Sequence, residues 1–176
     1  MASSRRSFIV GTSSILLGAA HANQLDAPNV VVIGPRLTTS GQPGAEALAG
    51  LRQLGFEAVV YLAPSTVPDA VEEEPAILAR QGIEFVHVPI PFGTPTQAHF
   101  ETVSEALQRL RGKNVLVHCQ VNMRASTLVF LYRVTRLGED PSTAWQDVTR
   151  VWVPGGAWKR LVTDVLARHG VDFAPF

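Results

Sequence analysis

The amino-acid sequence predicts an α/β fold, with a mostly parallel central sheet of about four to five strands flanked by helices and followed by C-terminal helices. Two observations lead to this prediction. Short apolar runs rich in β-branched residues alternate along the chain with segments of helical periodicity, an order typical of parallel sheets. The chain has 176 residues, of which 46% are hydrophobic and 17% are charged, a composition that suits a globular chain with a sizeable core.

The first predicted elements are a strand, a helix and a second strand. The apolar, β-branched residues 29–33 predict the first strand. The turn at residues 40–44, Ser-Gly-Gln-Pro-Gly, leads into a helix over residues 45–54, which Gly55 ends. Residues 56–62, Phe-Glu-Ala-Val-Val-Tyr-Leu, predict the second strand.

The next predicted elements are a helix, a strand and another helix. Residues 69–81 predict a helix with an acidic first turn, and the glutamates at 72–74 suit a solvated helix start because negative charge complements the helix dipole. Residues 83–90 predict a strand that ends among prolines. Residues 97–111 predict a helix, which the following glycine ends.

The last part of the chain predicts one strand followed by three helices. Residues 114–117 predict a short apolar strand, and apolar residues at helical spacing predict a helix over residues 124–137. An Asp-Pro pair starts the next helix, which runs to about residue 151. A Pro-Gly-Gly break precedes the last helix, over residues 157–169.

The N-terminus has the layout of a secretory signal. Arg5 and Arg6 precede a short apolar run, and Ala20-His21-Ala22 supplies small residues where a signal peptidase cleaves. The arginine pair followed by Phe-Ile resembles the twin-arginine export motif. We therefore predict a signal peptide over residues 1–22, a single domain over residues 23–176, and a periplasmic or secreted product. The apolar run is short and broken by Gly and Ser, so no stable membrane insertion is expected after cleavage.

The charge balance and the cysteine content exclude several classes of function. Lys and Arg together number 15, as do Asp and Glu, so the chain lacks the basic surplus of a dedicated nucleic-acid binder. The single cysteine, Cys119, excludes an intrachain disulfide framework and a multi-cysteine zinc site. A lone cysteine is either a small buried hydrophobic residue or a reactive thiol. We expect neither a cofactor nor a metal ion.

The segment His118–Ser126 is the predicted site. It follows a strand at the carboxyl edge of the predicted sheet, where such sheets bind ligands, and it leads into a helix. Loop amides and a helix N-terminus attract an oxyanion and stabilise a thiolate. Arg124 could grip two oxygens of a tetrahedral anion, Ser126 could donate to the sulfur, and His118 could orient the loop. The candidate catalytic residues are Cys119 and Arg124, and the candidate ligand-binding residues are His118, Gln120, Val121, Asn122, Met123, Arg124, Ala125 and Ser126.

This segment resembles the His-Cys-x5-Arg-Ser/Thr signature of the cysteine-dependent phosphatases. The wider resemblance is to bacterial tyrosine-phosphatase-like proteins of the dual-specificity type, through residues 40–43, residues 82–89 and the signature itself. Trp152-Val153-Pro154 with Trp158 resembles the tail of an exported subgroup. The resemblance implies a phosphatase-like fold and a phosphocysteine intermediate, with Cys119 as nucleophile and Arg124 as phosphate clamp. It also implies a phosphorylated small molecule or a phosphoprotein as the partner.

The spacing between cysteine and arginine departs from that signature. The related proteins have five residues there, and this chain has four. If the loop is shorter, Asn122 is best able to adopt the left-handed conformation where Gly is usual. If the loop keeps its length, Ala125 takes the usual arginine position. The Arg124 side chain then projects from the helix in a direction rotated by roughly 100° about the helix axis from the usual one.

A second departure concerns the general acid. The related enzymes carry an aspartate on a loop whose counterpart here, residues 89–95, contains no acidic residue. General acid catalysis contributes roughly 10²–10⁴-fold, so weak turnover is expected, above all for alkyl phosphates. His99, Glu101, Asp69 and Glu72 are candidate substitutes.

Other functions and roles stay open at this point. The chain could be a pseudophosphatase that binds anionic or phosphorylated ligands, a rhodanese-like sulfurtransferase, or an export factor with an inert cysteine. Gln42 either shapes its turn or forms a wall of the pocket. Trp145, Trp152 and Trp158 are expected to pack in the core or between helices.

Overall fold

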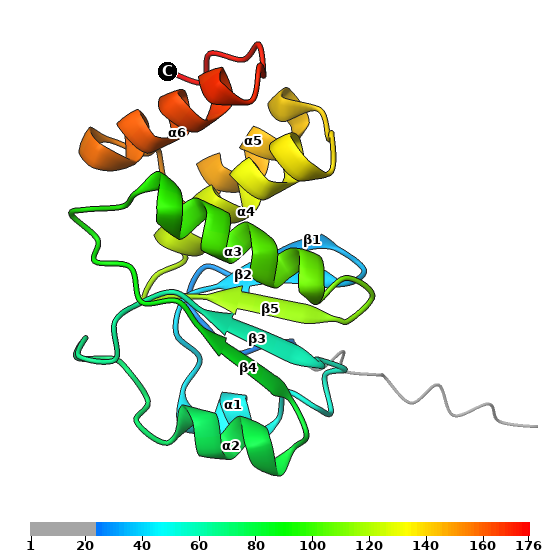
Figure 1. The fold of residues 1–176 in the computed structure, drawn as a ribbon. Helices are drawn as coiled ribbons and strands as arrows, with labels where there is room; N and C mark the ends of the chain where they lie inside the picture. Colours follow the sequence, from blue (N-terminus) through cyan, green and yellow to red (C-terminus); the bar gives the residue numbers. More distant parts are fainter. Residues whose placement is uncertain (1–23) are drawn as a thin grey trace, which may run out of the picture.

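A computed structural model describes residues 24–176, so the predicted signal peptide lies outside the described residues. Figure 1 shows the elements in chain order. The strands are β1 (Val31–Gly34), β2 (Leu37–Ser40), β3 (Ala58–Tyr61), β4 (Glu84–His87) and β5 (Val115–His118). The helices are α1 (Ala45–Ala49), α2 (Glu74–Arg80), α3 (Gln97–Arg109), α4 (Met123–Arg136), α5 (Pro141–Thr149) and α6 (Gly156–Arg168).

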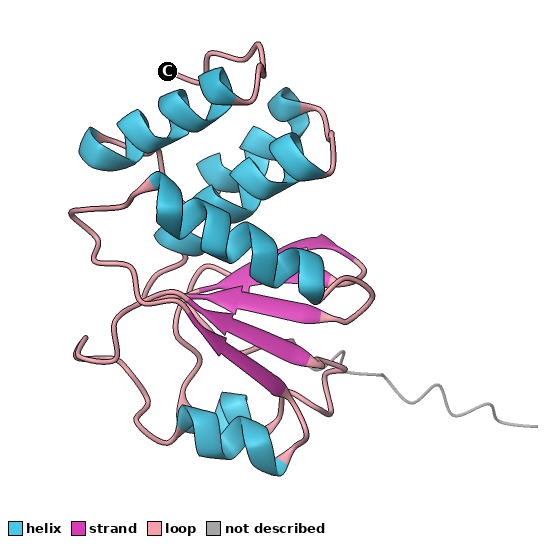
Figure 2. Ribbon diagram, in the orientation of Figure 1, coloured by secondary structure: helices cyan, strands magenta, loops and turns pink. Residues whose placement is uncertain are grey.

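The molecule has three layers, with the sheet in the middle. The strand order is β1-β2-β5-β3-β4, and every pair is parallel except the β1–β2 hairpin. Helices α1 and α2 cover one face, and α3 to α6 lie on the other (Figures 1 and 2). The predicted fold class, a mostly parallel sheet between helices with further helices at the C-terminus, is confirmed.

Strand β2 is the element that the sequence prediction missed. Residues 37–40 carry the polar side chains Thr38, Thr39 and Ser40, which by sequence resemble the approach to a turn. In the structure these side chains are buried, because β2 is an internal strand of a sheet whose two faces are both covered by helices. Hydrogen bonds replace apolar packing there: Thr39 Oγ1 accepts from Asn122 Nδ2 at 3.0 Å, and Ser40 Oγ donates to Gly41 O at 2.8 Å.

Two helices are shorter than predicted. Helix α1 stops at Ala49, and turns continue to Gly55. Helix α2 begins at Glu74 instead of residue 69, because Pro75 is tolerated only in the first turn of a helix, where its missing N–H is not needed. The prediction of a solvated acidic start is therefore wrong for Glu74, which is buried.

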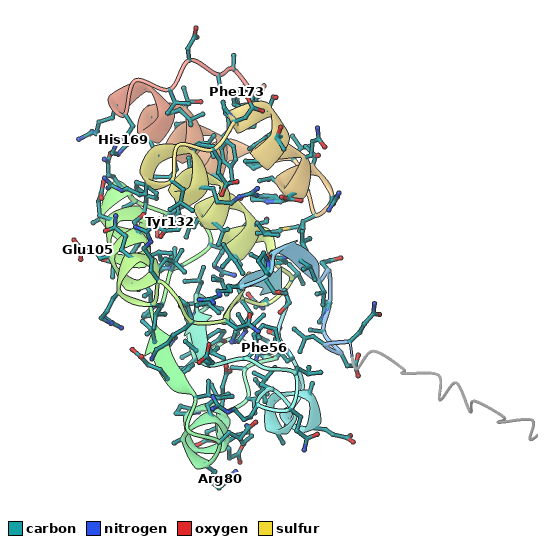
Figure 3. The ribbon with its side chains drawn as sticks, turned by 90° about the vertical axis from the view of Figure 1, so that its right-hand side faces the viewer. Phe56, Arg80, Glu105, Tyr132, His169 and Phe173 are labelled. Atoms are coloured by element: carbon teal, nitrogen blue, oxygen red, sulfur yellow. The ribbon has the colours of Figure 1, made fainter. Side chains whose placement is uncertain are left out.

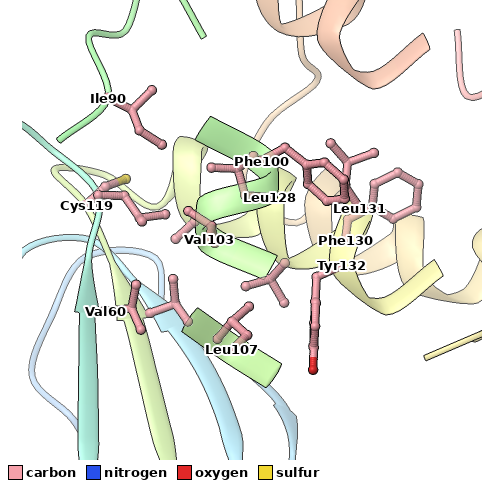
Figure 4. Close-up of a cluster of buried hydrophobic side chains, with 14 of the residues drawn as sticks. Val60, Ile90, Phe100, Val103, Leu107, Cys119, Leu128, Phe130, Leu131 and Tyr132 are labelled. Atoms are coloured by element: carbon pink, nitrogen blue, oxygen red, sulfur yellow. The ribbon is translucent and has the colours of Figure 1, made fainter. Parts of the chain in front are cut away.

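The core lies on both faces of the sheet. A smaller cluster under α1 and α2 includes Leu48 and Phe56, and the larger cluster under α3 to α6 includes Phe130 and Tyr132. Figure 3 shows Phe56 and Tyr132 in these separate layers. Cys119 belongs to the larger cluster, and Figure 4 shows its side chain at the end of a strand. The nucleophile candidate is thus fixed by the core beneath it.

The tryptophans pack as predicted. Trp145 meets Phe130 edge-on, with ring centroids 4.9 Å apart, and Trp158 is fully buried. Trp152 Nε1 donates to Thr127 Oγ1 at 3.1 Å, which ties the segment after α5 to α4. Within residues 24–176, no helix combines the length and the hydrophobicity needed to cross a bilayer.

Candidate active site

The candidate site lies at the carboxyl ends of the parallel strands, which converge in Figure 1. Strand β5 ends at His118, Cys119 follows, and α4 begins at Met123. We call residues 119–125 the anion loop. It sits at the edge of the sheet where parallel α/β folds bind ligands, and the fold therefore presents the predicted segment in the expected place.

The anion loop turns through a left-handed residue. Asn122 has φ 71° and is fully buried, so it adopts the left-handed conformation expected of it in the shorter of the two loops considered above. Its Nδ2 donates to Asn29 O at 2.6 Å and to Thr39 Oγ1 at 3.0 Å, while Asn29 Nδ2 donates to Val121 O at 3.0 Å. These bonds stabilise a conformation that non-glycine residues rarely adopt.

The segment after β2 holds the loop from its other side. Gln42 N donates to Gln120 O at 2.9 Å, and Cys119 N donates to Ser40 O at 3.3 Å. Gly41 approaches the loop so closely that an added Cβ would lie 2.7 Å from Gln120 O. The Ser-Gly-Gln-Pro motif is therefore part of the site, and the small residue within it permits the close contact.

Several loop amides are available to a ligand. Within the part of the chain that the structure describes, no atom accepts a hydrogen bond from the amides of Gln120, Val121 or residues 123–125. The N-terminus of the 14-residue helix α4 adds its partial positive charge to the same place. Such a cup of N–H groups suits a tetrahedral oxyanion.

The Arg124 guanidinium lies between the anion loop and the loop of residues 88–96. Its Nε donates to Ile90 O at 2.9 Å, and its Nη1 lies 3.5 Å from Gln120 Oε1. The guanidinium carbon is 5.1 Å from the centre of the Phe92 ring. The Arg124 side chain is buried, and no described atom accepts a hydrogen bond from its Nη2, so this nitrogen is available to an anion.

A buried polar group that the sequence prediction missed supports His118. Glu74 Oε1 and His118 Nε2 share a hydrogen bond of 2.7 Å, and Gln42 Nε2 donates to Glu74 Oε2 at 3.0 Å. All three side chains are buried. Glu74 thereby connects α2, the end of β5 and the segment after β2. Gln42 thus supports the site indirectly, through its hydrogen bond to Glu74. The proline after Glu74 was the signal that places this glutamate in a first helical turn.

Tyr61 extends this buried group along the sheet. Its ring stacks on His118 on one side and on His87 on the other, with centroids 4.7 Å and 4.9 Å away. Burial, together with the nearby carboxylates of Glu74 and Asp69, raises the pKa of Tyr61 to about 12. Its hydroxyl therefore stays protonated throughout the physiological range.

The remaining candidates take several positions. Ser126 Oγ donates to Met123 O at 3.3 Å, so in this state it does not donate to the sulfur. Ala125, the last residue of the anion loop, is buried, and the Val121 side chain is exposed. Among the described residues, three of the five buried side-chain polar atoms without a partner belong to this region: Gln42 Oε1, His118 Nδ1 and Asn122 Oδ1. An unpaired buried polar atom is unusual in a folded protein, and a bound water, an ion or a catalytic role can account for it. Residues 24–176 hold no group of three His, Cys, Asp or Glu side chains placed to bind a metal ion.

Replacing Gly41 with alanine should displace the anion loop. The new Cβ would lie 2.7 Å from Gln120 O and 2.8 Å from Pro28 Cβ, so one backbone must move. We expect Gly41→Ala to lower the free energy of unfolding by about 1–3 kcal/mol, measured by urea denaturation. Gly34→Ala is the matched control, because no heavy atom lies within 4 Å of its added Cβ. Equal unfolding midpoints for the two variants would contradict the close approach.

Removing the Glu74 carboxylate should destabilise the protein strongly. Glu74→Ala leaves the buried His118 Nε2 without its partner, and it leaves Gln42 Nε2 with only its longer bond to Pro43 O at 3.3 Å. We expect a loss of about 3–5 kcal/mol in the free energy of unfolding. Glu72→Ala, two residues earlier and exposed, should leave the urea midpoint unchanged. The buried group has no structural importance if the two variants unfold alike.

The chain is similar to solved phosphatase structures over most of its length. The DUF442 phosphatase of Shewanella putrefaciens CN-32 is 28% identical, with a TM-score of 0.75 over 82% of this chain and 95% of that one. Tk-PTP is 24% identical, with a TM-score of 0.63 over 83% and 99% of the two chains. TpbA of P. aeruginosa is 22% identical, with a TM-score of 0.63 over 82% and 91%. The last two show a shared fold.

Two further comparisons concern the sequence. A beta-lactamase hydrolase-like protein of Xylella fastidiosa is 30% identical over 108 residues, which are 60% of this chain and 25% of that protein. The chain thus spans about a quarter of the length of the curated relatives it matches. The family described as a DSP-PTPase phosphatase fused to NAD+ kinase matches residues 33–154. Since this match covers more than half of the sequence, the chain belongs to the DSP-PTPase family, within the superfamily of cysteine-dependent tyrosine and dual-specificity phosphatases.

Proposed function

We propose that this chain is a cysteine-dependent phosphatase that hydrolyses a phosphomonoester through a phosphocysteine intermediate. In the first step, the Cys119 thiolate attacks phosphorus, the S–P bond forms and the P–O bond to the leaving group breaks. In the second step, water attacks phosphorus and the S–P bond breaks. This division into two steps is the usual advantage of nucleophilic catalysis.

One observation supports this proposal: the loop that follows Cys119 combines several unpaired backbone amides with the Arg124 guanidinium. The amides of Gln120, Val121 and residues 123–125 have no acceptor in the described structure, and Nη2 of Arg124 is equally available. In the transition state of phosphoryl transfer, negative charge is spread over the three equatorial oxygens, and preorganised donors stabilise that charge.

The other loop residues have supporting roles in this proposal. Asn122 holds the left-handed turn, and Ala125 is buried at the end of the loop. His118, tied to Glu74, fixes the start of the loop next to the nucleophile. The Ser126 hydroxyl needs only a change of rotamer to leave Met123 O, and the proposal assigns it to the sulfur when the thiolate is the leaving group.

The proposed substrate is a phosphorylated small molecule or a phosphoprotein. A cysteine-to-serine form of TpbA of P. aeruginosa has been solved in complex with pTyr, which supports an aryl phosphate as the test substrate. Phe92 and Val121 are exposed beside the loop, where an aryl leaving group would gain apolar contact. Neither a nucleic acid nor a membrane lipid is required by this proposal.

The phosphatase proposal is tested by turnover of 4-nitrophenyl phosphate. We expect phosphate release that vanadate blocks, and a fall in kcat of roughly 10³–10⁶-fold for Cys119→Ser, because the hydroxyl is the weaker nucleophile. Glu105→Ala, an exposed change on α3, should leave kcat unaltered. Phosphate binding without turnover would favour a pseudophosphatase instead. A persulfide on Cys119 after thiosulfate treatment would favour a sulfurtransferase.

We also propose that the chain is exported. The proposal rests on the Arg5-Arg6 pair and on the small residues that end at Ala22, all outside the described residues. When the full chain is expressed in a bacterium with a twin-arginine translocase, we expect the shortened product in the periplasmic fraction. The double variant Arg5→Lys, Arg6→Lys should stay in the cytoplasmic fraction at full length. Identical fractionation of the two proteins would refute export by this route.

A further inference from the structure

In the related enzymes, the loop after β4 carries the general acid. In this chain the same loop, residues 88–96, makes packing and hydrogen-bond contacts instead. Residues 88–96 contain no acidic side chain. Phe92 lies beside the Arg124 guanidinium, and Phe92 O accepts from Trp158 Nε1 at 2.8 Å. The Phe92 ring also packs against Trp152 and Trp158, each 5.7 Å away between centroids. This loop thus supports the phosphate clamp, and a proton donor must come from another element.

Three of the four candidate acids lie in other surroundings. Glu101 pairs with Arg136 and lies 3.8 Å from His169 Nε2, so it belongs to a surface ion-pair group on α3. His99 caps the start of α3, where its Nδ1 accepts from Thr96 N at 3.1 Å. Glu72 is exposed and makes no hydrogen bond to a described side chain. None of these three side chains contacts the anion loop within the described structure.

Asp69 does contact the anion loop. Its Oδ1 accepts from Gln120 Nε2 at 2.8 Å, and Gln120 is the residue directly after Cys119. The other end of the same amide, Gln120 Oε1, faces Arg124 Nη1 at 3.5 Å. Asp69 lies on the loop between β3 and α2, which starts at the same carboxyl edge of the sheet as the anion loop. Its exposed carboxyl group therefore stands at the rim of the site, across Gln120 from the guanidinium.

The charge of Asp69 reaches the interior of the site as well. It is one of the causes that raise the pKa of Tyr61, together with Glu74 and Cys119, while Arg124 acts in the opposite direction. Burial is the largest cause of this shift, and the charges of Glu74 and Asp69 follow it. Asp69 is therefore close enough to the buried Tyr61 for its charge to act there, in addition to its hydrogen bond to Gln120.

We propose that Asp69 is the general acid of this phosphatase, supplied by the β3–α2 loop in place of the loop after β4. The inference rests on the proposed function. As the S–P bond forms and the P–O bond breaks, the proton of the Asp69 carboxyl group moves to the leaving oxygen. The leaving group departs as a neutral alcohol or phenol, and Asp69 becomes a carboxylate. In the second step, that carboxylate takes a proton from the attacking water, and the thiolate of Cys119 is regenerated.

A variant can distinguish whether Asp69 donates a proton or only positions Gln120. Asn at position 69 retains an oxygen that can accept from Gln120 Nε2, so Asp69→Asn preserves the hydrogen bond while removing the proton. Loss of a proton donor slows substrates with basic leaving groups most, since good leaving groups depart without help. The leaving-group dependence of kcat/KM is therefore a readout that a positioning role would not change.

The experiment compares phenyl phosphate and 2,4-dinitrophenyl phosphate as substrates of the full chain. For Asp69→Asn we expect kcat/KM to fall roughly 10²–10⁴-fold on phenyl phosphate and less than about tenfold on the dinitrophenyl ester. The neighbouring change Glu72→Gln is the matched control and should alter neither value. Urea midpoints equal to that of the unaltered chain show that both variants are folded.

Two results would overturn the inference and leave the proposed function standing. Equal losses on both substrates would make Asp69 a positioning residue, and no loss on phenyl phosphate would place the general acid elsewhere. If the unaltered chain shows no turnover of the dinitrophenyl ester, which needs no acid, the proposed function itself fails and the inference fails with it. Acid quench of Asp69→Asn during turnover of the dinitrophenyl ester should trap a phosphoenzyme, because the base of the second step is absent. Such a phosphoenzyme would support both the proposed function and the role of Asp69.

Discussion

The left-handed turn at Asn122 is the constraint on which the site depends. It lets α4 begin only four residues after Cys119, and the start of α4 determines where the amides of the anion loop and the Arg124 side chain lie. A non-glycine residue is disfavoured in this conformation, and the bonds from Asn122 Nδ2 to Asn29 and Thr39 offset that cost. Residues from the N-terminal hairpin and the segment before it thus fix the geometry of a loop that lies far along the chain.

A second buried contact holds the other side of the site. Glu74 joins His118 and Gln42, and Tyr61 closes the group from β3. A buried carboxylate is costly unless it is paired and hydrogen-bonded, so this arrangement needs all of its members together. The anion loop is therefore supported from both faces of the sheet, by the core around Cys119 and by this polar group, which keeps the loop amides aligned before any ligand binds.

The sequence predicted the apolar strands, the long helices and the position of the candidate site at the carboxyl edge of the sheet, because periodicity and the spacing of Cys119 and Arg124 are local signals. For a shortened loop, it named Asn122 as the residue best able to be left-handed, since few residue types tolerate that conformation, and Asn122 has φ 71°. It missed β2, because the buried Thr39 is polar and its hydroxyl accepts a hydrogen bond from Asn122 in the anion loop. It also predicted that Glu74 is solvated, whereas this side chain is buried. The contact between Asp69 and Gln120 was also out of reach, because it joins loops 51 residues apart and depends on the packing of the whole sheet.

The central claim is that the anion loop binds the phosphoryl group with Arg124 beside it. A crystal structure with orthovanadate bound tests this most directly. The account predicts vanadium bonded to Cys119 Sγ, with its equatorial oxygens accepting from the amides of residues 120–125 and from the Arg124 guanidinium. A vanadate-treated crystal in which the loop holds no anion, or in which Arg124 makes no contact with the bound anion, would contradict it.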